Sequence, residues 1–421
     1  YAKMFLTLWN VYKFHADYAA LDGFDPESSS SDPALRPELD RWVLSRLNTV
    51  ATEYHDGFVN WQFHKACRDL EDFIVNDLSN WYVRRSRRRL WDEAESGDKL
   101  ACQHTLHEVL TTLCRLIAPV SPFMVDIIHR NLTGSAVHQS DWPLGIPGTI
   151  EGATADHWDE AAAKATASLP PHDPALEASM NLVRELAEAG RRVRIDNNRR
   201  QRLPCSKGFI VAGPDLSAFH DLLAEELNVE FIQVENDLDR FQRIELAPNF
   251  RALAPKARAN VNDVANAIKS SEDPVGLLAE IDAGTATIMD IAIERSDVEV
   301  KRVEREGFAA QTVEVTHGET TSHVSLVLDM NDTPELLSKG MARDITRRVQ
   351  ARRKTLDLAL EATIELEVWM ENAPTMMAAD EEWVATETRT AACVFHSKGA
   401  SPPAGAERFE VDGTVVHFTV V

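Results

Sequence analysis

The chain contains the stretch Asn80-Trp81-Tyr82-Val83-Arg84-Arg85-Ser86-Arg87-Arg88-Arg89-Leu90-Trp91, with five arginines and three aromatic rings in twelve residues. The complete chain of 421 residues has a formal net charge of -23. A basic segment within such an acidic protein is typical of a surface that contacts a polyanion. The stretch therefore predicts a nucleic-acid contact.

Upstream of this stretch, apolar residues recur at helical spacing and predict a long helix that begins near Asn60 as its N-cap. Its apolar face comprises Phe63, Ala66, Cys67, Leu70, Phe73, Ile74, Asp77, Leu78 and Trp81. At the same period this face continues through Arg84, Arg85 and Arg88, whereas Arg87 and Arg89 flank it. Because guanidinium groups are not buried without partners, we expect the helix to leave its bundle here and to present these three arginines to RNA.

Four further helices are predicted from the same periodicity, around residues 4–19, 37–56, 106–117 and 122–132. Gly57 is expected to end the second of them, and Pro119 the third. Polar residues at 25–36 predict a loop or linker. Successive amphipathic helices with short connections favour an antiparallel helical bundle over residues 1–147.

The pattern then changes along the chain. Residues 148–202 predict a connector and a long helix, at about 174–198, and residues 203–421 a mixed α/β region with room for two subdomains. In that region we expect strands at 208–212, 229–234, 243–246, 287–294, 298–303, 311–315, 323–329, 364–370, 393–396 and 415–420, and helices at 217–227, 256–268 and 333–355. The predicted fold class is α + α/β, with the bundle first.

Two further arginine clusters follow the first. One comprises Arg191, Arg194, Arg199 and Arg200, and the other comprises Arg343, Arg347, Arg348 and Arg352. Arginine binds phosphate as a planar fork, and unstacked bases rest on aromatic rings. We therefore predict RNA contacts for these eight residues and for Trp81, Tyr82, Arg84, Arg85 and Arg88. The alternatives are salt-bridged surface faces for the arginines and bundle core for the two rings.

Catalytic motifs are missing: the sequence has no phosphate loop, dinucleotide turn, H-E-x-x-H pair or nucleophile elbow. His104 and His107 lack a third ligand at useful spacing, and the five cysteines form no C-x-x-C pair, so we expect neither a catalytic residue nor a metal. Unpaired cysteines indicate a reducing, cytoplasmic setting. No apolar run is long enough for a membrane span.

Twelve of the 44 basic residues are lysines and the rest arginines, within an excess of Asp and Glu. This composition is typical of proteins that work in concentrated salt. It indicates a halophilic source, where screening leaves short-range arginine contacts to carry recognition.

Several segments together resemble the anticodon-binding helical domain of class I aminoacyl-tRNA synthetases of the isoleucine, valine and leucine group. They are Phe5-Leu6-Thr7-Leu8-Trp9-Asn10-Val11-Tyr12, Asp40-Arg41-Trp42-Val43-Leu44-Ser45-Arg46-Leu47, Asn80-Trp81-Tyr82-Val83-Arg84, Leu116-Ile117-Ala118-Pro119-Val120-Ser121-Pro122-Phe123 and Asp141-Trp142-Pro143. Further segments are similar to the C-terminal region of the isoleucyl family in its archaeal and eukaryotic form. These are Glu226-Leu227-Asn228-Val229, Leu246-Ala247-Pro248-Asn249-Phe250 and Gly340-Met341-Ala342-Arg343-Asp344-Ile345-Thr346-Arg347-Arg348-Val349-Gln350.

The resemblance implies a tRNA-binding segment whose partners are tRNA(Ile) and the catalytic and editing domains of the same polypeptide. The family's H-I-G-H and K-M-S-K-S signatures are absent, so we expect no catalysis and no cofactor in this segment. ATP with Mg would serve the parent enzyme, a cytoplasmic monomer that joins isoleucine to its tRNA. The cysteines do not match the zinc site of bacterial relatives. Alternatives are the equivalent region of a valyl or leucyl enzyme, or a non-catalytic RNA-binding scaffold protein.

Overall fold

The computed structural model describes residues 2–27, 36–91, 96–143, 169–317, 320–359, 362–371, 376–396 and 399–420. These residues form two compact units, Tyr1–Asn181 and Leu182–Val421. Most of the predicted loop at 25–36, and of the connector before residue 169, lies outside the described residues. The long predicted helix is α8 (Pro174–Asp196), which begins in the first unit and ends in the second.

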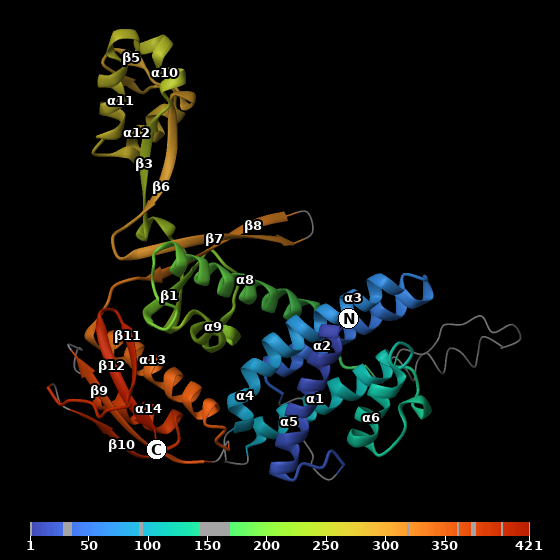
Figure 1. The fold of residues 1–421 in the computed structure, drawn as a ribbon. Coiled ribbons are helices and arrows are strands. Elements are labelled where there is room, and N and C mark those ends of the chain that lie inside the picture. The colour runs from blue at the N-terminus through green and yellow to red at the C-terminus, as the bar shows by residue number, and fades with distance from the viewer. Residues whose placement is uncertain are drawn as a thin grey trace, which may run out of the picture. The chain divides into compact units, whose positions relative to one another are not determined.

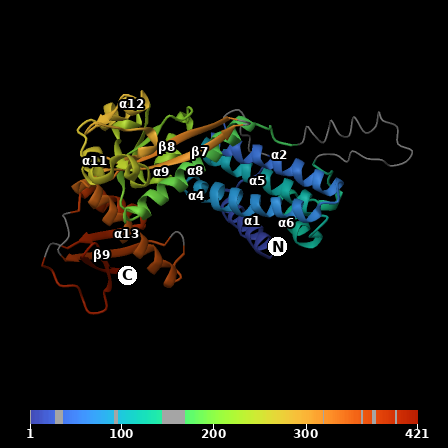
Figure 2. The ribbon, with the colours of Figure 1, turned by 90° about the horizontal axis from the view of Figure 1, so that it is seen from above.

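The first unit is an antiparallel helical bundle, as predicted (Figures 1 and 2). Its elements are α1 (Ala2–Asp22), α2 (Glu38–Val59), α3 (Phe63–Asp72), the π-helical segment η2 (Phe73–Val83), α4 (Arg84–Trp91), α5 (Gly97–Ile117), α6 (Pro122–Thr133) and the 3₁₀ turn η3 (Val137–Gln139). The core holds Met4, Leu8, Trp42, Leu47, Tyr54, Leu70 and Phe73, each exposed by 1% or less. The third helix predicted from the sequence is therefore a continuous run of α3, η2 and α4.

Local sequence signals set most of the helix ends in the bundle. The Ser96 side chain accepts a hydrogen bond from the Lys99 amide and so caps α5. The same helix ends at Ile117, just before Pro119, as expected. Gly134 ends α6 in the left-handed conformation.

The turn between α2 and α3 differs from the prediction in two ways. Gly57 lies inside α2 rather than at its end, and a Cβ there would approach the Ala66 Cβ to 2.7 Å. Glycine is thus required by the close packing of the two helices and not by a left-handed turn. Asn60 is the C-cap of α2, whereas α3 begins at Phe63, so the prediction that Asn60 caps the third helix is wrong.

The start of α8 is attached to the bundle by a buried polar network. Glu177 accepts hydrogen bonds from Ser45 at 2.5 Å and Thr49 at 2.8 Å, and pairs with Arg46 at 3.0 Å. Arg46 also contacts Asp77 at 3.3 Å. Burial alone would lower the pKa of Arg46, but these two carboxylates raise it above its ordinary value. The first turns of α8 therefore belong to the bundle.

The second unit begins with a four-stranded sheet in the order β2-β1-β8-β7. Its strands are β1 (Cys205–Val211), β2 (Val229–Glu235), β7 (Phe308–His317) and β8 (Thr320–Asp329). The turn η4 (Ser217–Phe219) and helix α9 (His220–Leu227) connect β1 to its parallel neighbour β2. A Cβ on Gly190 would meet Leu227 at 2.1 Å and Leu326 at 3.2 Å, so α8 packs tightly on α9 and β8.

A helical insertion lies between two paired strands, β3 (Gln242–Pro248) and β6 (Val298–Glu304) (Figure 1). It comprises α10 (Phe250–Ala257), η6 (Arg258–Asn260), α11 (Val261–Lys269), α12 (Pro274–Asp282), β4 (Thr287–Ile288), β5 (Ile291–Ala292) and η7 (Arg295–Asp297), with η5 (Leu238–Arg240) preceding β3. Two predictions are corrected here. Arg258, at φ 45°, divides the helix expected at 256–268, and the turn at Met289 and Asp290 makes the strand expected at 287–294 a short hairpin.

The last part of the second unit is a sheet in the order β10-β9-β12-β11, packed against two helices. Its elements are α13 (Pro334–Thr355), β9 (Ile364–Glu371), α14 (Ala378–Glu387), β10 (Thr390–Phe395), β11 (Glu407–Val411) and β12 (Thr414–Val420). The mixed α/β character predicted for this region is confirmed. Among the described residues, no helix has both the length and the apolar composition to cross a membrane.

Candidate nucleic-acid interface

The π-helical segment η2 changes which side of α4 is buried. Its wider turns, with i→i+5 hydrogen bonds, rotate the following helix relative to a uniform α-helix. The buried face therefore passes from Tyr82 to Ser86 and Leu90. Arg84 and Arg88 are exposed, as expected, and Arg85 is half-buried. The helix does not leave the bundle, however, because Ser86 and Leu90 are buried, so the prediction that the apolar face runs on through the three arginines is wrong.

Arg89, expected only to flank that face, is instead fixed inside the bundle. Its Nη1 and Nη2 atoms donate to the two carboxylate oxygens of Asp40 at 2.7 and 2.8 Å, and its Nε donates to Asp98 at 2.9 Å. The Tyr82 hydroxyl also donates to Asp40, at 2.8 Å. Burial raises the pKa of Tyr82, which keeps this hydroxyl a donor. The Asp40 side chain is completely buried, so Arg89 supplies its counter-charge.

The exposed arginines of the first cluster are Arg84, Arg87 and Arg88. The Arg84 Nε donates to the Asn80 carbonyl at 2.9 Å, and its guanidinium lies 5.8 Å from the Trp81 ring centre. These contacts orient the guanidinium at the surface of the helix. The three side chains form the exposed arginine patch of α4, which is chemically suited to phosphate.

The two aromatic residues predicted to stack on bases are in the bundle core. Tyr82 is completely buried and Trp81 is 5% exposed. Neither ring offers an open face to a base, because helices of the bundle cover both. Both rings are therefore part of the bundle core, which was the alternative to base stacking that the sequence left open.

The second arginine cluster, in the second unit, is anchored within the protein. Arg194 is 1% exposed and donates to the backbone carbonyls of Arg200, Leu203, Leu227 and Asn228 and to the Cys205 sulfur, at 2.7 to 3.3 Å. Its burial lowers its pKa. A cation so enclosed cannot reach RNA, so the prediction of an RNA contact for Arg194 is corrected. Its role here is to hold the segment after α8 to the turn before β2.

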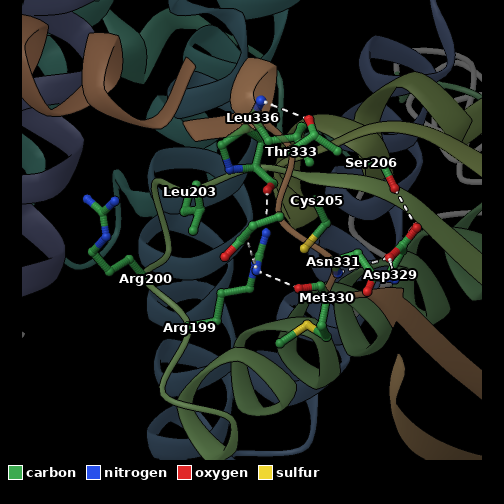
Figure 3. A network of polar contacts seen from close by, with 12 residues as sticks. Arg199, Arg200, Leu203, Cys205, Ser206, Asp329, Met330, Asn331, Thr333 and Leu336 are labelled. Carbon is green, nitrogen blue, oxygen red and sulfur yellow. Dashed lines mark hydrogen bonds and ion pairs between the residues drawn. The ribbon is translucent and has the colours of Figure 1, made fainter. Parts of the chain in front are cut away.

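The neighbouring arginines of this cluster also have protein partners. Arg199 donates to the carbonyls of Met330 and Pro204 at 3.0 and 2.8 Å, as part of the network that joins the end of β8 to α13 (Figure 3). Arg200 pairs with Asp344 and Asp412, and Arg191 pairs with Glu188 and Glu226. We place these residues in the framework of the second unit.

The third cluster, on α13, is divided between anchored and exposed side chains. Arg343 is partly buried and donates to the Asn228 side chain, and burial lowers its pKa. Arg352 pairs with Glu407 at 3.0 Å, and the Arg348 guanidinium lies 5.3 Å from the Phe409 ring centre. Arg347 and Arg348 are exposed. These two are the members of the cluster that a ligand could reach.

The residues considered for metal binding have other contacts. His107 lies 3.1 Å from the Leu132 carbonyl, and His104 packs edge-on against Phe24 with ring centres 5.0 Å apart. Across the described ranges, no three His, Cys, Asp or Glu side chains are arranged to hold a metal. Cys102, Cys114 and Cys205 are buried and Cys67 and Cys393 partly so. Burial raises the pKa of Cys102 to about 11.

Trp61, which is 81% exposed in the turn between α2 and α3, was not among the residues predicted to bind RNA. The available signal was a tryptophan between Asn60 and Gln62 in a segment without charged residues. Such a segment is not amphipathic, so hydrophobic periodicity does not distinguish Trp61 as a candidate binding residue.

Part of the chain matches the model of a known domain family. Residues 40–208 match the family model for the anticodon-binding domain of tRNA ligases, and this range contains most of α2, helices α3 to α6 and all of α8. The chain therefore contains an anticodon-binding domain of a tRNA ligase.

Over most of its length, the chain is similar to isoleucine–tRNA ligases. The chain is 33% identical to isoleucine–tRNA ligase 2 of a Bacillus cereus strain over 87% of this chain and 33% of the relative. It is 31% identical to the isoleucine–tRNA ligase of Natronomonas pharaonis over 98% of this chain and 38% of that protein, and 34% identical to that of Streptomyces coelicolor over 90% and 34%. The chain is thus homologous to isoleucine–tRNA ligases over most of its length, and it spans about a third of the length of these relatives.

Proposed function

We propose that this chain is the C-terminal, tRNA-binding portion of an isoleucine–tRNA ligase and that its ligand is tRNA(Ile). The observation that carries this proposal is the match of the helical bundle to an anticodon-binding domain, within a chain homologous to isoleucine–tRNA ligases over most of its length. In the parent enzyme, isoleucine would be activated with ATP and Mg and joined to the tRNA at sites elsewhere in the polypeptide.

The segment itself would contribute binding energy rather than chemistry. Holding the anticodon arm fixes the position of the distant acceptor end, and correct positioning lowers the barrier of a reaction without any acid, base or nucleophile in this segment. We propose that it acts as part of a monomeric, cytoplasmic enzyme together with the catalytic and editing domains of the same polypeptide.

Phosphate contacts are assigned to the exposed arginine patch of α4. Arg84, Arg87 and Arg88 lie on a helix within the matched domain and extend into solvent. The chain carries a net charge of -23, so its overall field repels RNA and local arginine contacts must offset this repulsion. The patch is therefore the place where removal of positive charge should most weaken binding.

Replacement of Arg84, Arg87 and Arg88 together by alanine should weaken tRNA binding and flatten its dependence on salt. Each lost phosphate contact should reduce the slope of log affinity against log salt by about 1. The measurement is filter binding of a tRNA transcript with an isoleucine anticodon to the 421-residue chain over a series of salt concentrations.

The matched control replaces Lys3, Lys13 and Arg130, which are exposed cations on α1 and α6. This control also removes three positive charges, but from α1 and α6 instead of α4. If both triple variants reduce the affinity and the slope equally, the effect belongs to net charge and the patch is not a phosphate site.

A further inference from the structure

The turn between α2 and α3 presents an aromatic side chain in an uncommon backbone conformation. Trp61 has φ 61° and is 81% exposed. A positive φ places the Cβ of a bulky residue against its own backbone, and such strain persists only where the surroundings impose it. Exposure of a tryptophan also forgoes the burial that usually stabilises this side chain.

The turn is rigid, because successive amides are hydrogen-bonded. Asn60 N donates to the Asp56 carbonyl at 2.9 Å, Trp61 N to Phe58 at 3.2 Å and Gln62 N to Gly57 at 2.7 Å. The close approach of Gly57 to Ala66 fixes the separation of the two helices beneath the turn. Trp61 is therefore presented in one backbone geometry before any ligand arrives.

A series of rings supports the exposed tryptophan from below. Trp61 packs edge-on against Phe63 with ring centres 5.6 Å apart, and Phe63 packs edge-on against Phe58 at 4.9 Å. The Phe58 ring lies tilted against Tyr54, with centres 4.6 Å apart. Exposure falls along this series, from 81% at Trp61 to 41% at Phe63 and 1% at Tyr54. The outer ring is thus held on a base that is part of the bundle core.

The chemistry around the ring favours a neutral, planar ligand. Residues 57–64 contain no Asp, Glu, Lys or Arg, and Gln62 and His64 are exposed beside Trp61. The side-chain Nδ2 of Asn60 donates to the Asp56 carbonyl at 2.8 Å, which leaves the side-chain oxygen of Asn60 as an acceptor. A π-face flanked by amide and imidazole groups suits a nucleobase, which stacks through its face and forms hydrogen bonds through its edge. Phosphate would find no cation within this turn.

We propose that Trp61 is a stacking platform for an unpaired base of the bound tRNA and that Gln62 contacts the edge of that base. This inference rests on the proposed function and adds a specific base-contacting residue to it. Trp61 and the exposed arginine patch lie at opposite ends of the continuous helix formed by α3, η2 and α4, from Phe63 to Trp91. Base contact and phosphate contact can therefore be removed separately.

The test compares the wild-type 421-residue chain with its Trp61→Ala and Trp61→Phe variants for binding to a tRNA transcript that carries an isoleucine anticodon. Loss of one base stack should weaken binding by about 5- to 100-fold in Trp61→Ala. Trp61→Phe should retain much of the affinity, and the salt dependence should be unchanged in both. The matched control is Trp9→Ala, which removes a 40% exposed tryptophan from α1 and should bind as wild type does.

A fourth variant separates stacking from folding. Trp61→Gly relieves the positive φ, so it should unfold at the same temperature as wild type or at a higher one, and yet bind tRNA as weakly as Trp61→Ala. A lower unfolding temperature for Trp61→Gly would show that the ring stabilises the bundle, and it would overturn the proposal.

Wild-type affinity in Trp61→Ala, or a change only in self-association on sedimentation, would also overturn it. The latter result would assign the turn to a second copy of the chain. If the wild-type chain binds no tRNA, the proposed function itself is refuted. If the wild-type chain binds tRNA and replacement of Trp61 leaves the affinity unchanged, only the role of Trp61 is refuted.

Discussion

Replacement of Asp40 by alanine is expected to lower the free energy of unfolding of the bundle by about 3–5 kcal/mol, the usual cost of removing one partner of a buried ion pair. The Asp40 carboxylate is fully buried and accepts two hydrogen bonds from Arg89 and one from Tyr82. Without it, the partly buried Arg89 guanidinium loses its two buried acceptors and the completely buried Tyr82 hydroxyl loses its carboxylate acceptor. Urea unfolding followed by tryptophan fluorescence measures the effect, because seven of the nine tryptophans lie in residues 1–181.

Asp98 provides the matched control for this prediction. It also binds Arg89, at 2.8 Å, but its side chain is 49% exposed. Asp98→Ala should therefore change the free energy of unfolding by no more than about 1 kcal/mol, as for other exposed ion pairs. Similar losses in the two variants would contradict the account of Arg89 as a buried structural cation.

In the second unit, the largest effect is expected from Arg194→Met. Methionine retains the length of the apolar stem but removes the guanidinium donors from four backbone carbonyls. The carbonyls of Arg200 and Asn228 keep backbone amide donors, whereas those of Leu203 and Leu227 lose the donors that Arg194 provides. Unsatisfied buried acceptors cost about 1–3 kcal/mol each, and partial rearrangement should limit the total loss to about 3–5 kcal/mol. Calorimetry of the full chain should show a lower transition temperature, and hydrogen exchange should show lost protection at Leu203 and Asn228.

Arg192 is the matched control, since it lies on the same helix and its side chain is 64% exposed beside Glu188. Arg192→Met should leave both the transition temperature and the exchange pattern close to wild type. An Arg194→Met variant with unchanged stability would return Arg194 to the set of residues free to contact RNA.

Local chemistry made the helix boundaries predictable. Proline at 119 and 122 and glycine at 134 act through their own backbone preferences, which do not depend on distant residues. The continuous apolar run at 208–211 and the alternation over 364–370 likewise depend only on neighbouring positions in the sequence. The short elements α12, β11 and α14 were not predicted, because each has few residues from which to establish a period.

Local sequence chemistry could not predict which arginines are buried with protein partners and which are exposed. Arg192 and Arg194 are two positions apart on one helix, yet one is exposed and the other is buried and donates to four carbonyls from two later segments. The burial of Tyr82 and Ser86 depends on η2, whose wider turns break the period assumed for the preceding residues. Tertiary contacts and a local change of helix type decide both cases.

Anticodon reading is measured by the affinity of the 421-residue chain for a tRNA transcript with an isoleucine anticodon, compared with the same transcript carrying a valine anticodon. We expect the isoleucine form to bind more tightly by at least about fivefold, the effect of one base contact worth about 1 kcal/mol or slightly more. Equal affinities for the two transcripts would contradict the claim that this chain reads the anticodon of tRNA(Ile).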